Sequence, residues 1–167
     1  IPADRYLQPR WSFDGSRIAF TDGIDVWTMK ADGTSRSLIT NYAESNEGGK
    51  EKPSMASYPI WSVKGEMLCY TLTVYDGKKV LHQLWVVNAD GSKPKMFFSE
   101  EVDSQFQVFL PEYTNQPFFD VDDERIFYTA AGDGVPNILA VEIKDGAQRR
   151  LTDKGAIYPA LLPEEGV

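Results

Sequence analysis

Short apolar runs separated by tight turns recur along this chain in three copies. Each copy opens near a proline, at Pro9, Pro59 and Pro117, crosses a turn, and enters a second apolar run. These second runs are Ile18-Ala19-Phe20, Met67-Leu68-Cys69-Tyr70 and Ile126-Phe127-Tyr128. Consecutive apolar residues over so short a length are typical of a β-strand that is covered on both faces.

The second half of each copy carries an Asp-Gly pair between two further runs, at Asp32-Gly33, Asp90-Gly91 and Asp145-Gly146. Asp-Gly between apolar runs is a strong signal for a hairpin, because glycine accepts the positive φ that a tight turn requires. Each copy therefore contains four predicted strands. They span 8–12, 16–21, 24–30 and 34–40 in the first copy, 58–62, 66–73, 82–88 and 93–98 in the second, and 116–121, 125–130, 136–143 and 147–152 in the third.

A repeated meander of four strands predicts an all-β fold built of β-propeller blades. The expected architecture is a partial β-propeller over residues 1–167, with antiparallel blades at about 6–40, 58–98 and 116–152. The first strand of a fourth blade is expected at Tyr158–Leu162.

Three blades and one strand do not close a ring, since propellers have roughly 4–8 blades. Open ends would leave apolar blade faces in water. Because the chain starts at Ile1 and stops inside a repeat, the favoured interpretation is a fragment of a larger propeller. The alternative is that a second copy completes the ring.

The first copy reads Pro9-Arg10-Trp11-Ser12-Phe13-Asp14-Gly15, then Ile18-Ala19-Phe20, and closes at Leu38-Ile39-Thr40. This pattern resembles the WD-like blades of the TolB type, which also occur in the propellers of prolyl-oligopeptidase-type peptidases. Phe13 stands where the family usually has proline, Lys64 replaces the Asp in the second copy, and the third copy lacks the Trp and Gly of the first turn. The resemblance implies a non-catalytic scaffold that binds proteins in the bacterial periplasm or outside the cell.

Composition narrows the function classes. A net charge of −8 argues against nucleic-acid binding, which needs clustered Lys and Arg. No apolar run approaches the roughly 18 residues of a membrane span, so no membrane insertion is expected.

Candidate catalytic chemistry is sparse, and neither catalytic residues nor a cofactor is predicted. His82 is the only histidine, and no Gly-x-Ser-x-Gly nucleophile elbow is present. One histidine and Cys69 together fall short of the three or four ligands of a structural zinc site. Cys69 lies in a predicted strand and is expected to be a small buried hydrophobe.

Two further sets of residues give structural expectations. The carboxylates at Asp120, Asp122, Asp123 and Glu124 could form a calcium loop, but a degenerate first turn is the favoured interpretation. Trp11 and Trp61 occupy equivalent positions, so both are expected to be buried between blades.

Loop lengths differ between the two ends of the predicted blades. Because strand direction alternates, the long connections 41–57 and 99–115 and the hairpin tip 75–79 should share one end. The first connection reads as a flexible loop, whereas the second is apolar enough to pack on the propeller or on a partner. The predicted partner-binding residues are Tyr42, Glu47, Tyr75, Asp76, Phe106 and Tyr113.

The favoured function is a non-catalytic scaffold for a protein partner. The alternative is the propeller module of a larger hydrolase of the prolyl-oligopeptidase type, with its catalytic domain outside this chain. A carbohydrate lyase or hydrolase built on the propeller would need a histidine cluster or paired carboxylates at the ring centre.

Overall fold

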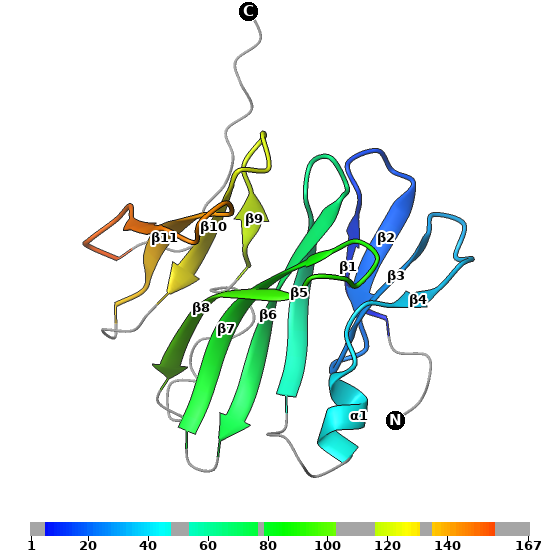
Figure 1. The fold of residues 1–167 in the computed structure, drawn as a ribbon, viewed down its shortest axis with the longest axis horizontal. Helices are drawn as coiled ribbons and strands as arrows, with labels where there is room; N and C mark the ends of the chain where they lie inside the picture. The colour runs from blue at the N-terminus through cyan, green and yellow to red at the C-terminus, as the bar shows by residue number, and fades with distance from the viewer. Residues whose placement is uncertain (1–5, 48–53, 77–78, 103–115, 131–134, 156–167) are drawn as a thin grey trace, which may run out of the picture.

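A computed structural model describes residues 6–47, 54–76, 79–102, 116–130 and 135–155 (Figure 1). Within these residues the chain forms twelve β-strands and one short helix. The strands are β1 (Leu7–Trp11), β2 (Arg17–Thr21), β3 (Val26–Lys30), β4 (Ser37–Leu38), β5 (Ser54–Trp61), β6 (Met67–Asp76), β7 (Lys79–Asn88), β8 (Lys95–Val102), β9 (Phe118–Phe119), β10 (Arg125–Ala130), β11 (Asn137–Glu142) and β12 (Gln148–Arg150), and the helix is α1 (Tyr42–Glu47).

The strands form three separate antiparallel sheets of four strands each, in the order in which the chain visits them. Sheet 1 is β1–β4, sheet 2 is β5–β8 and sheet 3 is β9–β12. This arrangement confirms the predicted all-β fold with four-stranded meanders. The predicted first strand of a fourth blade, Tyr158–Leu162, lies outside the described residues.

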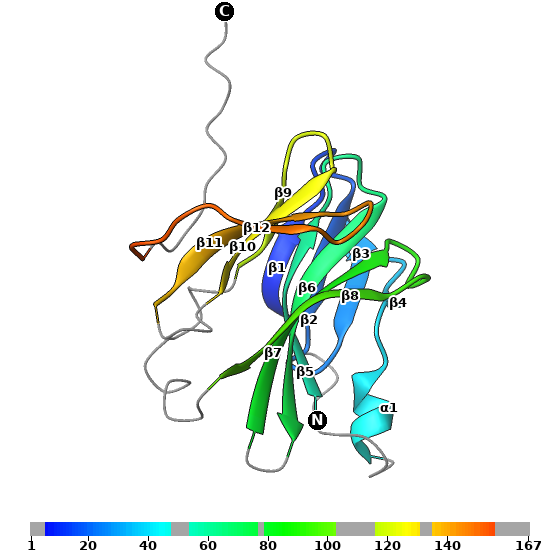
Figure 2. The ribbon, with the colours of Figure 1, turned by 60° about the vertical axis from the view of Figure 1, so that its left-hand side comes forward.

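The innermost strands of the three sheets, β1, β5 and β9, lie next to one another, and the outer strands point away from them (Figures 1 and 2). Arg10 Nη2 on β1 donates to Gln116 Oε1, just before β9, at 3.2 Å, across 106 residues of sequence. The three sheets are therefore arranged as part of a ring, with the first strand of each sheet on the inside.

Strand lengths depart from the prediction at several places. β4 has two residues rather than the seven predicted over 34–40, and β12 has three. Sheet 2 is longer than expected, because β6 and β7 pair continuously from Met67↔Asn88 to Asp76↔Lys79 and β8 stays paired up to Val80↔Val102. Pairing with a long neighbour extends these strands past the residues whose apolar pattern predicted them.

Two hydrophobic clusters fill the spaces between the sheets. Sheets 1 and 2 enclose one cluster around Trp61, Tyr70 and Val26, and sheets 2 and 3 enclose another around Cys69 and Ile126. Cys69 is fully buried there, as predicted, and burial raises the pKa of its thiol. The core of the molecule therefore lies between sheets.

The prediction that both equivalent tryptophans are buried is correct for one of them. Trp61 is 2% exposed, whereas Trp11 is 59% exposed. The physical reason is position. Trp61 packs against sheet 1, whereas the described residues form no further sheet that covers Trp11 on the corresponding side of sheet 1. The prediction for Trp11 was therefore wrong.

The first long connection is not entirely a loop, because it begins with α1. The buried side chain of Asp25, in the β2–β3 turn, accepts hydrogen bonds from the backbone N–H groups of Tyr42 at 2.6 Å and Ala43 at 3.0 Å. Its Oδ1 also accepts from the Thr40 hydroxyl at 2.6 Å. A carboxylate that binds free N–H groups at a helix start stabilises that helix. Asp25 thus fixes the start of this connection against sheet 1.

Candidate functional site

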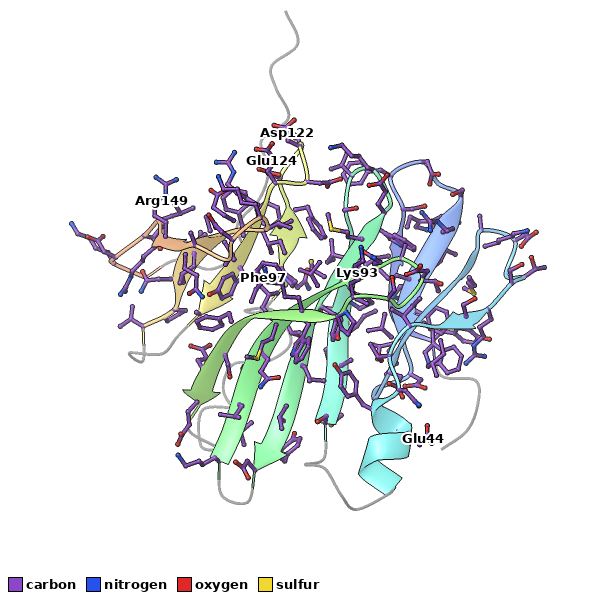
Figure 3. All side chains as sticks on the ribbon, viewed as in Figure 1. Glu44, Lys93, Phe97, Asp122, Glu124 and Arg149 are labelled. Atoms are coloured by element: carbon purple, nitrogen blue, oxygen red, sulfur yellow. The ribbon has the colours of Figure 1, made fainter. Side chains whose placement is uncertain are left out.

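The two ends of the sheets differ in structure. One, the tight-turn end, carries the β1–β2, β5–β6 and β9–β10 turns, and Asp122 and Glu124 lie there (Figure 3). The other, the loop-bearing end, carries α1 with Glu44 and the tip of the β6–β7 hairpin (Figures 1 and 3).

Side chains close the turns at the tight-turn end. The Ser12 hydroxyl accepts the Arg17 N–H at 2.9 Å, and the Ser62 hydroxyl accepts the Met67 N–H at 3.1 Å. Asp120 occupies the equivalent position in sheet 3, where its carboxylate accepts the N–H groups of Glu124 and Arg125 at 2.8 and 3.2 Å. The acidic run of the third copy is thus a turn that satisfies its own backbone, which is the favoured interpretation of the sequence.

The predicted partner-binding residues that the structure describes lie at the loop-bearing end. Tyr42 starts α1, where its hydroxyl and that of Tyr70 are 2.8 Å apart. Burial, followed by the nearby Tyr42 hydroxyl, raises the pKa of Tyr70. This contact anchors the half-buried Tyr42 to the core, so only part of its ring faces outward.

Tyr75 and Asp76 end strand β6 at the hairpin tip. Tyr75 is 38% exposed, and Asp76 pairs with Lys79 across the hairpin. Lys79 Nζ lies 2.7 Å from Glu101 Oε2 on β8, and this hydrogen bond raises the pKa of Lys79. This end of sheet 2 therefore presents the exposed Tyr75 ring and the Lys79–Glu101 ion pair.

Glu47 is the last residue of α1, and Phe106 and Tyr113 lie outside the described residues. The structure thus brings α1, which starts the first long connection, and the end of β6 to the same end of the sheets (Figure 1).

A small cavity between sheets 2 and 3 was not predicted. It measures about 20 Å³, which is room for about one water molecule. Its lining comes from three strands of sheet 2 and from β10: Thr71, His82, Gln83, Leu84, Phe98, Glu100, Tyr128 and Thr129. His82 and Tyr128 are far apart in sequence and on different sheets, so no local pattern could indicate that they meet.

Burial sets the chemistry of this cavity. The hydroxyl of Tyr128 is buried, and none of the residues that the structure describes hydrogen-bonds to it. Burial raises its pKa, as does the nearby Glu100, and burial lowers the pKa of His82. Among the described residues, no three His, Cys, Asp or Glu side chains gather as a metal site.

Comparison with solved structures supports these observations. A TolB-type protein from Agrobacterium tumefaciens superposes on 90% of the chain with a TM-score of 0.64 at 17% sequence identity. TolB from Acinetobacter baumannii superposes on 92% with a TM-score of 0.61 at 18% identity. The β-propeller domain of the Trilobed protease from Pyrococcus furiosus superposes on 88% with a TM-score of 0.58 at 11% identity.

This chain has a β-propeller fold. The resemblance of its repeats to TolB-type blades is therefore confirmed at the level of the fold. The chain spans 47% of the A. tumefaciens protein, 34% of the A. baumannii protein and 42% of the protease propeller, so each of these contains about two to three times as much chain.

The propeller's sequence matches no family model and no curated protein. None of the described helices is both long and apolar enough to cross a membrane.

Proposed function

We propose that this chain is a non-catalytic propeller scaffold that binds a protein partner through its loop-bearing end. The observation that carries the proposal is the asymmetry between the ends. Turn side chains and backbone groups satisfy one another at the tight-turn end, whereas the loop-bearing end presents α1 and the exposed Tyr75. Functional contacts in rigid scaffolds concentrate on such connections.

The proposed contact residues are those that the sequence predicted: Tyr42, Glu47, Tyr75, Asp76, Phe106 and Tyr113. Aromatic rings rimmed by carboxylates suit a polar protein interface. Tyr75 combines exposure with a position at the end of a long strand that pairs along its whole length with β7, so its backbone is fixed before binding. A backbone that is ordered beforehand loses little conformational entropy on contact.

The likeness to TolB structures supports a location in the bacterial periplasm or outside the cell. It is also the reason for preferring a scaffold over an enzyme. Cys69 is buried with a raised thiol pKa, and His82 lines a small cavity together with Tyr128 and Glu100.

The second candidate is the propeller module of a hydrolase of the prolyl-oligopeptidase type. Its support is the superposition on the propeller domain of the P. furiosus protease. An α/β-hydrolase region encoded in the same polypeptide would favour this candidate, whereas a small mixed domain before the propeller would favour a TolB-like scaffold.

Pull-down from a bacterial periplasmic extract tests the proposal. The substitution Tyr75→Ala should weaken capture of the partner about 10-fold or more, because exposed aromatic anchors dominate protein interfaces. The thermal melt should change little, since the ring is already 38% exposed.

Matched controls lie at the opposite end. Asp32→Ala and Asp90→Ala change exposed residues in the β3–β4 and β7–β8 turns and should leave capture intact. If these turn variants lose the partner while Tyr75→Ala retains it, the binding end has been assigned backwards.

A further inference from the structure

Sheet 1 presents an exposed apolar side formed by β1 and its turn. This leading face consists of Pro9, Trp11 and Phe13, of which Trp11 and Phe13 are 59% and 69% exposed. The equivalent residues of sheet 2 include Pro59 and Trp61, and both are buried, Trp61 in the cluster between sheets 1 and 2. The repeat therefore indicates what kind of surface covers a leading face, namely another four-stranded sheet.

The contact between sheets 1 and 2 is specific. The guanidinium of Arg17, the first residue of β2, lies over the Trp61 ring at 4.3 Å from its centroid. Arg17 also donates a hydrogen bond to the carbonyl of Gly65, and Trp61 Nε1 donates to the Arg10 carbonyl at 3.2 Å. A cation over an indole face is a favourable pairing.

The contact between sheets 2 and 3 uses the same two repeat positions. Met67 is the first residue of β6, equivalent to Arg17, and it packs on the cluster that contains Phe119, which is equivalent to Trp61. The first residue of the second strand thus packs toward the next sheet at both junctions, over the Trp61 ring at one and on the cluster that contains Phe119 at the other.

Among the residues that the structure describes, one at each end of the series lacks this counterpart. Trp11 begins the series on sheet 1, and Arg125, the first residue of β10, ends it on sheet 3. Arg125 is 39% exposed in its side chain and pairs with Asp120 through Nε at 2.8 Å. Its position matches that of Arg17. If sheet 3 packed against Trp11 as sheet 1 packs against Trp61, Arg125 and Trp11 would form the same Arg–Trp pair that joins sheets 1 and 2.

The side of sheet 3 that bears Arg125 is also apolar. Ile126 and Tyr128 face sheet 2, so the alternation of a strand turns Phe127 the other way. Phe127 stacks on Phe118 with ring centroids 5.1 Å apart. Arg125, Phe118 and Phe127 form what we call the trailing face of sheet 3.

We infer that the trailing face of sheet 3 in one copy of this chain docks on the leading face of sheet 1 in a second copy. Two such contacts related by a two-fold axis close a ring of six sheets, within the roughly 4–8 blades that propellers have. The chain spans 47% of the A. tumefaciens protein, so two copies supply about as much chain as that structure contains.

Sedimentation equilibrium of the full chain tests this inference. The native chain should associate to twice its own mass with rising concentration, with no larger species, because the ring is closed. Trp11→Ala should raise the dissociation constant at least about 30-fold, as truncation of a central aromatic residue does. Met96→Ala, which truncates a side chain that is 46% exposed on β8 of sheet 2, is the matched control and should leave the dissociation constant unchanged.

A mixing experiment identifies which faces meet. Trp11→Ala and Arg125→Ala should each be monomeric alone but should form a heterodimer when mixed, because one of the two junctions then carries both native residues. Circular dichroism of each variant confirms that it is folded.

Any of three outcomes would overturn the inference. The native chain could be monomeric at every concentration, which would assign the leading face to a blade of a longer polypeptide. Alternatively, Arg125→Ala could leave the dimer intact, or the mixture of the two variants could fail to associate.

Discussion

Trp11 and Trp61 show that the environment of a residue depends on its neighbours as much as on its place in the repeat. Both end the first strand of their sheet, and both precede a serine that closes a turn. Within the described part of the chain, only Trp61 has a sheet packed against it, and that sheet supplies the Arg17 guanidinium and the Arg10 carbonyl. The indole of Trp61 therefore contributes to the core, whereas that of Trp11 contacts solvent in the single chain.

Alanine substitution should separate the two tryptophans. Trp61→Ala should lower the free energy of unfolding by about 3–5 kcal/mol, the usual cost of truncating a large buried aromatic side chain. Trp11→Ala should lower it by less than about 1 kcal/mol in urea melts at concentrations where the chain is monomeric. A cost below about 1 kcal/mol for Trp61→Ala would contradict its burial between sheets 1 and 2.

At the scale of the element, the first turn of each sheet uses a side-chain oxygen to accept the N–H that starts the second strand. Ser12 and Ser62 do this with a hydroxyl, and Asp120 does it with a carboxylate. Asp120 Oδ2 also accepts from Arg125 Nε at 2.8 Å. The third turn thus relies on a charge where the first two rely on a neutral group.

That charge should make sheet 3 sensitive to acid. Burial raises the pKa of Asp120, but the hydrogen bonds from Arg125 and Glu124 outweigh it, so the folded-state pKa lies below the usual value. A carboxylate with a lowered pKa stabilises the fold fully above its unfolded pKa, which is about 3.9 for aspartate. This contribution is lost as the pH falls through the folded-state pKa.

Asp120→Ser is the matched variant, since it installs the residue found in sheets 1 and 2. It should cost about 1–3 kcal/mol at pH 7, where the native carboxylate is ionised. Urea melts from pH 7 down to about pH 2 should show the difference between native chain and variant shrinking below about pH 4. A difference independent of pH would mean that the ionised form of Asp120 does not stabilise the turn.

The sequence was sufficient to predict the elements that local chemistry determines. Asp-Gly turns and short apolar runs indicated four strands per copy and the all-β fold, because turn geometry depends on the residues inside the turn. Strand lengths were less predictable: β8 continues to Val102 because the long strand β7 pairs with it. Asp25 caps α1 through residues that follow it by 17 and 18 positions, so no local sequence pattern could indicate this contact.

The candidate site followed the same division. Tyr75 and Asp76 were predicted at a hairpin tip from turn signals, and the structure places them at the end of β6. The cavity lined by His82, Glu100 and Tyr128 could not be predicted, since it exists only where sheets 2 and 3 pack together. Contacts between sheets depend on tertiary structure that no single repeat specifies.

At the scale of the whole molecule, the three sheets form a series in which each contacts its neighbours. The free energy of unfolding of such a series is approximately the sum of the contributions of the individual sheets and of the contacts between neighbouring sheets. Asp123 is one of these junctions: its carboxylate accepts hydrogen bonds from the backbone N–H groups of Val63 at 2.6 Å and Lys64 at 2.8 Å. It therefore joins the first turn of sheet 3 to the first turn of sheet 2.

Asp123→Gly tests whether this junction couples the sheets. Asp123 has a φ of 61°, and the equivalent glycines, Gly15 and Gly65, have φ values of 68° and 72°, so glycine relieves backbone strain there. The loss of two charge-assisted hydrogen bonds outweighs that relief, so the variant should be less stable by about 1–3 kcal/mol. Hydrogen exchange should show the loss of protection in β10 and β11 of sheet 3, while β2 and β3 of sheet 1 keep theirs, because sheet 1 still has its Arg17–Trp61 junction.

The control for this variant is Asp122→Gly, which removes a neighbouring exposed carboxylate and should leave the exchange pattern unchanged. Gly65→Ala is not a suitable control, since a Cβ there would lie 2.8 Å from Arg17. Equal loss of protection in all three sheets would show that the molecule unfolds as one unit and that the Asp123 contact does not set the stability of sheet 3.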